Sequence, residues 1–313
     1  MAEMTRSNVR RTRWVRVALG LVALLGLTEL GLRVAGLGEF PTYLKDDHFG
    51  YIPKPDQAGR FLDRNEWVFN DRSMGVATPW QASDRTDVLL VGNSIVLGGN
   101  AYNQPDKLAP LMQSKLSASC SVWPVAAGGW ATVNEFRYLD RRTDVVAGAD
   151  FFVWEYMAHQ MGGLAKWSRP TLHPLERPLW LTGYVVGKAL DQRFPTAARF
   201  EVKAPSDEAP YFAEFEAMLE RLTQASGRRP AGLIFLYPDL NQLEMARAGK
   251  EWLPDRAEVQ RVAARHGVVL IDLAAMPQWK PALYKDGVHP SIEGNAVLAT
   301  ILASEIRRLA HGC

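Results

Sequence analysis

A serine at the end of an apolar run is the first residue of this chain that could do chemistry. The run VLLV, residues 88–91, has the length and composition of a buried strand, and Gly92-Asn93-Ser94 follows it with the composition of a tight turn. In open α/β sheets ligands bind at the carboxyl ends of the strands, so Ser94 would stand where chemistry is usually done. We predict that Ser94 is a nucleophile; the alternative is that GNS is only a polar turn.

A histidine and an aspartate near the other end of the chain have the spacing of a base and its orienting acid. The segment Asp286-Gly287-Val288-His289-Pro290 follows the last predicted strand and precedes the last predicted helix, with Pro290 suited to the first helical turn. An aspartate three residues before a histidine can fold back to accept the Nδ1 proton, which leaves Nε2 free as a base. A lone DxxH is more often a turn or a satisfied surface histidine. Because a serine alkoxide is hard to form without such a base, we predict that Ser94, His289 and Asp286 act together.

Strand-like and helix-like segments alternate after residue 87 and would bring these two loops together. Strands are predicted at 88–91, 121–126, 151–156, 232–237 and 268–273, and helices near 107–116, 133–142, 210–225, 255–265 and 291–310. Five βα units with right-handed crossovers predict an α/β fold, a doubly wound parallel sheet of five strands with helices on both faces.

The charge of the chain is concentrated at its start. The composition, 47% hydrophobic and 22% charged over 313 residues, is that of an ordinary globular protein. Residues 1–16 contain five arginines against Glu3, a net of +4, which leaves about −2 of the formal +2 for everything that follows. A nearly neutral body has no basic stripe for a phosphate backbone, and no zinc-finger spacing occurs. We therefore predict no nucleic-acid partner.

An apolar segment follows the arginines and is typical of a membrane-directed helix. Residues 17–28 are uncharged, and the apolar character continues to residue 38, interrupted only by Glu29 and Arg33, which could pair four residues apart on a helix. Twelve residues suit a signal peptide, whereas 17–38 is long enough to span a bilayer. Because the cleavage pattern is poor, we predict an uncleaved single-pass anchor with a cytoplasmic N-terminus. The rest would lie outside the inner membrane of a bacterium, in the periplasm, or in a eukaryotic secretory lumen.

These features predict a domain organisation. Residues 1–16 form a basic tail, 17–38 the anchor, 39–84 a leader of loops with a hairpin packed on the main domain, and 85–313 the main α/β domain. The leader's spaced aromatic residues are interpreted as core contacts in preference to a ligand box. Residues 160–206 form a proline-containing insertion, either a lid or a loop that covers apolar surface.

Neither cysteine nor histidine usage indicates a metal site. Cys120 and Cys313 are too few and too far apart for a metal cluster or a CxxC redox pair, and the sequence leaves open whether they pair. The six histidines are scattered, and Asp46-Asp47-His48 is best interpreted as a solvated loop. We predict no metal and no cofactor.

The pairing of GNS with DGVHP resembles the SGNH hydrolases, also called GDSL-like lipases and esterases. The resemblance covers residues 87–310, although Asn93 replaces the family's usual aspartate, which is not its catalytic acid. It implies the flavodoxin-like form of the sheet already predicted. It also implies Ser94 as nucleophile, His289 as general base and Asp286 as the acid that orients it.

The resemblance also implies an oxyanion hole with three donors. The first is the backbone N–H of Ser94, and the second is a glycine N–H after the second strand, for which we choose Gly129, with Gly128 as the close alternative. The third is an asparagine after the third strand, and here this chain has His159. A histidine N–H could donate, or His159 could cap a helix or pack on the insertion. The departure matters because one lost donor typically costs about 10²–10³ in rate.

These residues predict an acyl-enzyme on Ser94. Transfer of the acyl group to water would make the protein an esterase, and transfer to a sugar hydroxyl an O-acyltransferase, for which a membrane partner protein could supply the acyl donor. The expected substrate is a small ester or an acylated carbohydrate, with O-acetyl groups of a surface or exported polysaccharide as the first choice. The alternative is a non-catalytic relative that binds glycans or scaffolds a membrane complex.

Overall fold

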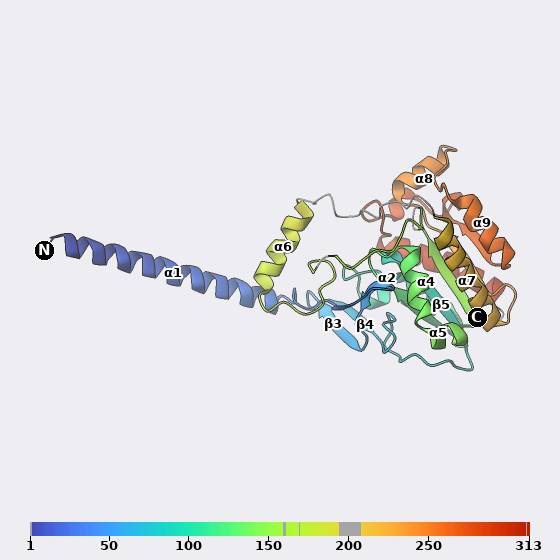
Figure 1. Cartoon of the computed structure of the whole chain (residues 1–313), viewed down its shortest axis with the longest axis horizontal. Helices are drawn as coiled ribbons and strands as arrows, with labels where there is room; N and C mark the ends of the chain where they lie inside the picture. Colours follow the sequence, from blue (N-terminus) through green and yellow to red (C-terminus); the bar gives the residue numbers. More distant parts are fainter. Residues whose placement is uncertain (1, 159–160, 169, 194–207, 311) are drawn as a thin grey trace.

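A five-stranded parallel sheet forms the centre of the protein (Figure 1). The computed structural model describes residues 2–158, 161–168, 170–193, 208–310, 312 and 313. The strands β5 (Thr86–Gly92), β6 (Cys120–Ala126), β7 (Phe151–Tyr156), β8 (Gly232–Leu236) and β9 (Val269–Asp272) lie in the order β6-β5-β7-β8-β9, and every neighbouring pair is parallel. The predicted doubly wound, flavodoxin-like sheet is confirmed.

The central strands are apolar throughout because both faces of the sheet are covered. All seven residues of β5 are buried, and successive side chains alternate between two core clusters. Leu89 and Val91 pack in one cluster, whereas Val88 and Leu90 pack in the other. A strand buried on both sides reads as a continuous hydrophobic run, which is why the sequence predicted it without any alternation.

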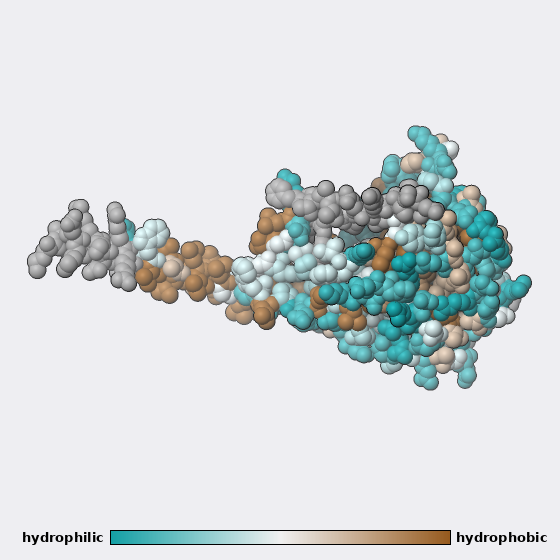
Figure 2. Space-filling view, in the orientation of Figure 1, coloured by the Kyte–Doolittle hydropathy of each residue, from teal (hydrophilic) through white to brown (hydrophobic). Residues whose placement is uncertain are grey.

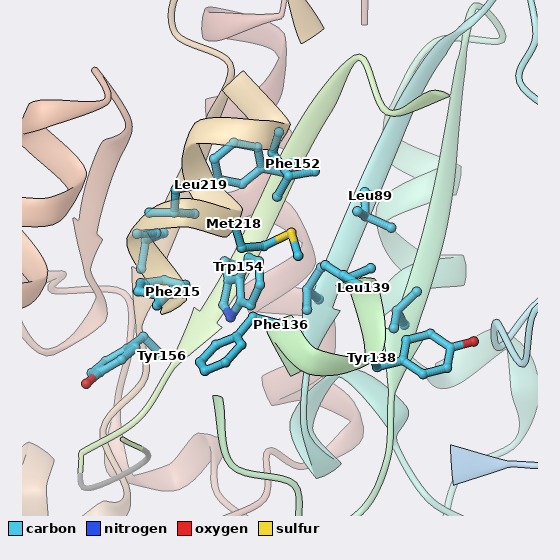
Figure 3. Close-up of a cluster of buried hydrophobic side chains, with 14 of the residues drawn as sticks. Leu89, Phe136, Tyr138, Leu139, Phe152, Trp154, Tyr156, Phe215, Met218 and Leu219 are labelled. Carbon is cyan, nitrogen blue, oxygen red and sulfur yellow. The ribbon is translucent and has the colours of Figure 1, made fainter. Parts of the chain in front are cut away.

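Helices supply both covering layers. On one face lie α4 (Thr132–Asp140), α5 (Thr143–Gly148), α7 (Ala209–Ser226) and α9 (Arg256–Arg265), and on the other α2 (Ser94–Leu97), α3 (Leu108–Lys115), α8 (Leu240–Arg247) and α10 (Ile292–Leu309). Short 3₁₀ turns occur at Gln104–Asp106, Leu273–Ala275 and Pro281–Leu283. Figure 3 shows how Phe136 and Leu139 of α4 and Phe215 of α7 pack against Trp154 of β7. The five predicted helices are present, and the short α2, α5 and α8 were not predicted.

Two small hairpins precede the sheet. Strands β1 (Tyr43–Asp46) and β2 (Gly50–Pro53) pair antiparallel, as do β3 (Gln57–Phe61) and β4 (Asn65–Phe69). Tyr43, Phe49 and Tyr51 are buried in the same core cluster as α4 and β7. The first hairpin is therefore part of the main core, and its aromatic residues come close to the carboxyl edge of the sheet.

The N-terminal helix meets the residues before and at the start of α6. Helix α1 (Ala2–Val34) contains a stretch, Arg13–Val34, that is long and apolar enough to cross a membrane and is not buried in the structure (Figure 2). The Glu29 carboxylate accepts hydrogen bonds from Arg33 at 2.8 Å and from the backbone N–H groups of Leu181 and Thr182 at 3.0 and 2.8 Å. Those two N–H groups open helix α6 (Leu181–Arg193), whose first turn would otherwise lack acceptors. Arg33 also donates to the Leu179 carbonyl at 2.8 Å, so the two charges of the apolar segment attach α1 to the start of α6 and to the residues before it.

A disulfide joins Cys120 at the start of β6 to Cys313, the last residue of the chain. The backbone N–H of Ser117 also donates to the Cys313 carbonyl at 2.9 Å. The pairing that the sequence left open is therefore formed, and it ties the segment after α10 to an edge strand of the sheet.

Cys313→Ser should lower the free energy of unfolding by about 2–4 kcal/mol, because the disulfide restricts the unfolded chain across a separation of 193 residues. Urea titration of the purified full chain, followed by tryptophan fluorescence, would measure this loss. A Cys120→Ser/Cys313→Ser double variant is the control and should lose no more than the single one. Equal stability of the wild type and both variants would contradict a structural role for the bond.

Candidate active site

A sharp turn after β5 presents Ser94. A Cβ on Gly92 would lie 2.4 Å from Glu155 Oε2 and 2.5 Å from Val96 Cγ2, so only glycine lets the strand approach β7 this closely before it turns. Asn93 then caps α2, its Oδ1 accepting the N–H of Ile95 at 3.1 Å. The asparagine that departs from the family pattern thus has a local role, and Ser94 is the first residue of the helix.

His289 lies between Ser94 and Asp286. Its Nε2 is 2.9 Å from Ser94 Oγ, and its Nδ1 is 3.0 and 3.1 Å from the two Asp286 carboxylate oxygens. Asp286 Oδ1 also accepts the backbone N–H of His289 at 2.9 Å and that of Val288 at 3.2 Å. Burial alone would raise the pKa of Asp286, but the hydrogen bonds from His289 lower it below its ordinary value. Asp286 is therefore an anion that can hold the imidazole with Nδ1 protonated and Nε2 free to accept a proton.

Hydrogen bonds from the body of the protein hold the loop that carries the histidine. The N–H of Leu240 donates to the Gly287 carbonyl at 2.8 Å, and the Tyr237 hydroxyl donates to the Val288 carbonyl at 2.7 Å. Gly287 has a φ of +84°, a conformation that favours glycine. Pro290 was predicted in the first turn of the last helix, but it precedes the N-cap Ser291, and the helix begins at Ile292. The serine hydroxyl, which bonds the N–H of Gly294, is the better cap.

The second predicted oxyanion donor lies in a turn after β6. Gly92 of β5 is paired with Ala126 of β6, so the turn from Ala127 to Trp130 lies beside the turn that presents Ser94. The N–H of Trp130 donates to the Ala127 carbonyl at 3.3 Å, and Gly129 has a φ of +77°, the signature of a type II turn.

Two side chains donate to the carbonyl of Gly128 within that turn. They are the Tyr51 hydroxyl and His173 Nε2, each at 2.9 Å. Because a trans peptide directs its C=O and N–H to opposite sides, the N–H of Gly129 points away from Tyr51 and His173. Among the described residues, the backbone N–H groups of Ser94 and Gly129 have no hydrogen-bond acceptor. Both predicted donors are therefore available to a ligand, while their role stays a prediction.

The third predicted donor, His159, lies outside the described residues. Strand β7 ends at Tyr156, three residues before it, and the role of His159 stays a prediction. Among the residues that are described, no group of three or more histidine, cysteine or acidic side chains could hold a metal ion.

Sequence reasoning missed three residues that support the site. Glu155 is fully buried below the turn and accepts the N–H of Asn93 at 3.1 Å; an acidic residue inside an apolar strand was the signal for it. Tyr51 and His173 had no local signal, because they lie 77 and 45 residues from Gly128 in the chain.

Burial raises the pKa of Glu155 to about 8, although hydrogen bonds from Asn93 oppose the shift. The folded protein therefore binds this proton more tightly than the unfolded chain, so stability is lost as the pH rises from the ordinary value of 4.5 through about 8. The side chain introduced by Glu155→Gln cannot ionise. The Tm of this variant minus the Tm of the wild type should therefore increase from pH 5 to pH 8. Glu244→Gln, at an exposed position of α8, is the matched control and should show no such trend. A Glu155→Gln difference that is flat across this range would contradict the account.

Comparison with known proteins finds similarity to solved structures alone. No family model and no curated protein matches the sequence, whereas 37 solved chains match the structure. They include TesA, with 13% identity over 71% of this chain and 99% of that one at a TM-score of 0.43. A carbohydrate acetylesterase family member from Sinorhizobium meliloti matches at 16% identity over 72% of this chain and 98% of that one, with a TM-score of 0.39. A lipase/acylhydrolase from Enterococcus faecalis matches at 17% identity over 71% and 95%, with a TM-score of 0.42.

The fold itself is defined by the order and direction of the strands. A parallel sheet in the order β6-β5-β7-β8-β9, with helices on both faces, is the architecture that the resemblance to the SGNH hydrolases implies. By its topology, this chain has the flavodoxin-like fold that the resemblance implies.

Proposed function

We propose that this protein is a serine-dependent acyl-ester hydrolase that works through an acyl-enzyme on Ser94. The observation that carries the proposal is the chain of hydrogen bonds from Asp286 through His289 to the Ser94 hydroxyl, with both contacts of the imidazole at about 3 Å. Three side chains separated by up to 195 residues meet in the order that nucleophilic catalysis requires. A scaffold or glycan-binding protein would not require this hydrogen-bonded arrangement of Asp286, His289 and Ser94.

The geometry supports a two-step reaction. His289 Nε2 takes the Ser94 proton as Oγ bonds to the ester carbonyl carbon, and the carbonyl oxygen becomes an oxyanion between the N–H groups of Ser94 and Gly129. Collapse breaks the bond to the alcohol, which leaves with the proton from His289. Water then attacks the acyl-serine, His289 takes its proton, and a second collapse releases the acid and restores the Ser94 hydroxyl.

The acid–base pair is open to solvent, since the side chains of His289 and Asp286 are 38% and 50% exposed. Water can reach the acyl-enzyme, which favours hydrolysis over transfer to a sugar hydroxyl. An open site also suits an acyl group carried on a large polymer. We therefore propose O-acetyl groups of a surface or exported polysaccharide as the substrate, with O-acetyl transfer to such a polymer as the second candidate activity.

The proposed location is the outer face of the cell membrane, with α1 as a single-pass anchor and the N-terminus in the cytoplasm. The arginines before the apolar stretch support this orientation, because positive residues stay on the cytoplasmic side. The Cys120–Cys313 disulfide supports an oxidising compartment, such as the bacterial periplasm. Leu179 and Trp180, which are 98% and 60% exposed where α1 meets α6, suit the border of a membrane.

Ser94→Ala should lower the rate of para-nitrophenyl acetate hydrolysis by at least about 10³-fold, because no nucleophile remains to form the acyl-enzyme. The measurement uses the detergent-solubilised full chain. Ser114→Ala, which removes an exposed hydroxyl on α3, is the matched control and should retain activity. Equal rates for the wild type and Ser94→Ala would refute the catalytic proposal and favour the scaffold.

A second arm separates hydrolysis from transfer. An oligosaccharide acceptor is added, and mass spectrometry follows the acetyl group. Free acetate without acetylated oligosaccharide supports the hydrolase, and acetylated oligosaccharide that depends on Ser94 supports the transferase.

A further inference from the structure

We infer that Tyr51 and His173 are positioning residues of the oxyanion hole, which hold the peptide between Gly128 and Gly129 with its N–H towards Ser94. The inference rests on the proposed function and adds to it two residues from outside the sheet. Tyr51 belongs to strand β2, and His173 lies in the segment between β7 and α6.

The two side chains saturate one carbonyl oxygen. A carbonyl has two lone pairs, and the Gly128 oxygen receives the Tyr51 hydroxyl and His173 Nε2, both at 2.9 Å. A Cβ placed on Gly129 would lie 3.1 Å from the Tyr51 hydroxyl oxygen, so that hydroxyl lies directly against the turn. The opposite end of the same peptide is the Gly129 N–H, which no hydrogen bond among the described residues takes up.

The protonation states of both side chains suit donation. Burial raises the pKa of the Tyr51 hydroxyl above its ordinary value, so the hydroxyl keeps its proton. Burial also lowers the pKa of His173 to about 4, against an opposing effect of the Gly128 hydrogen bond. His173 is therefore neutral at pH 7. Since a carbonyl can only accept, its Nε2 must carry the single ring hydrogen.

Contacts around the two donors fix their positions. Their rings stack with centroids 4.1 Å apart and planes at 29°, and Trp130 Nε1 donates to the Tyr51 carbonyl at 2.6 Å. On the other side Trp167 Nε1 donates to the His173 carbonyl at 2.7 Å, and the N–H of Tyr43 donates to the Pro174 carbonyl at 2.8 Å. Each donor is thus held by contacts around its own segment of the chain, and these contacts come from the protein itself.

Such a pair matters because the central peptide of a two-glycine turn rotates easily. A flip of the Gly128–Gly129 peptide would exchange its C=O and N–H, aim the carbonyl at the oxyanion and leave two buried donors without an acceptor. The bonds to Tyr51 and His173 oppose that flip. They also polarise the peptide, which makes the Gly129 N–H a stronger donor on the side where charge develops.

Four variants test the inference in the detergent-solubilised full chain, with para-nitrophenyl acetate as substrate. Tyr51→Phe and His173→Phe each remove one donor but keep an aromatic ring. Each should lower kcat about tenfold. The double variant should lower kcat about 10²-fold, which approaches the effect of removing one oxyanion donor, and KM should stay within about twofold of the wild type. His173→Gln returns an N–H at the end of a side chain and should recover part of the loss.

Tyr43→Phe is the matched control. The Tyr43 and His173 ring centroids are 4.8 Å apart, but in the described part of the chain the Tyr43 hydroxyl makes no hydrogen bond to the Gly128 oxygen, so kcat should not change. Tm is measured for every variant. Where a substitution lowers Tm more than Tyr43→Phe does, the decisive comparison is the kcat of His173→Gln against that of His173→Phe, because these two variants differ in the N–H donor.

The outcomes separate this inference from the proposed function. If hydrolysis requires Ser94 but Tyr51→Phe and His173→Phe keep the wild-type kcat, or change KM alone, the positioning role is overturned and the hydrolase stands. If Ser94→Ala is as active as the wild type, the proposed function is overturned and the positioning role with it.

Discussion

The candidate site depends on the register of the parallel strands around β5. Because Gly92 is paired with Ala126, the turns after β5 and β6 come side by side, and the glycine at position 92 leaves room for Glu155 of β7 beneath the serine turn. A shift of one residue would turn every side chain of β5 to the opposite face of the sheet. The two apolar clusters that cover the sheet prevent that shift, so the packing of the core and the geometry of the site have the same origin.

The site is not contained in the sheet and its helices alone. Tyr51 from the first hairpin and His173 from the segment before α6 meet at the Gly128 carbonyl, while Glu29 and Arg33 of α1 bind residues at and just before the start of α6. The segment that carries His173 and Leu179 therefore contacts both the end of α1 and the turn beside Ser94. The predicted division into a leader, 39–84, and a main domain, 85–313, stays a prediction, and the functional unit that we propose includes both.

Local patterns in the sequence predicted much of this structure. Strands buried on both faces appear as apolar runs, and the spacing of Asp286 and His289 determines their mutual geometry within one loop, so both could be predicted. Contacts between distant segments could not. Tyr51 and His173 have no spacing relative to Gly128 that a pattern could reveal, and the Cys120–Cys313 bond depends on where α10 ends against β6. Glu155 could be noticed in the sequence as an acidic residue inside an apolar strand, but no sequence pattern linked it to Asn93, whose N–H it accepts.

The proposed function requires Ser94 to be an activated nucleophile. Treatment of the full chain with a fluorophosphonate, followed by peptide mapping with mass spectrometry, tests it most directly, because the reagent bonds to serine oxygens that a base activates. We expect a single adduct on Ser94 in the wild type and at least about a 10²-fold slower reaction in His289→Ala. An adduct on another serine, or labelling of Ser94 at the same rate without His289, would contradict it.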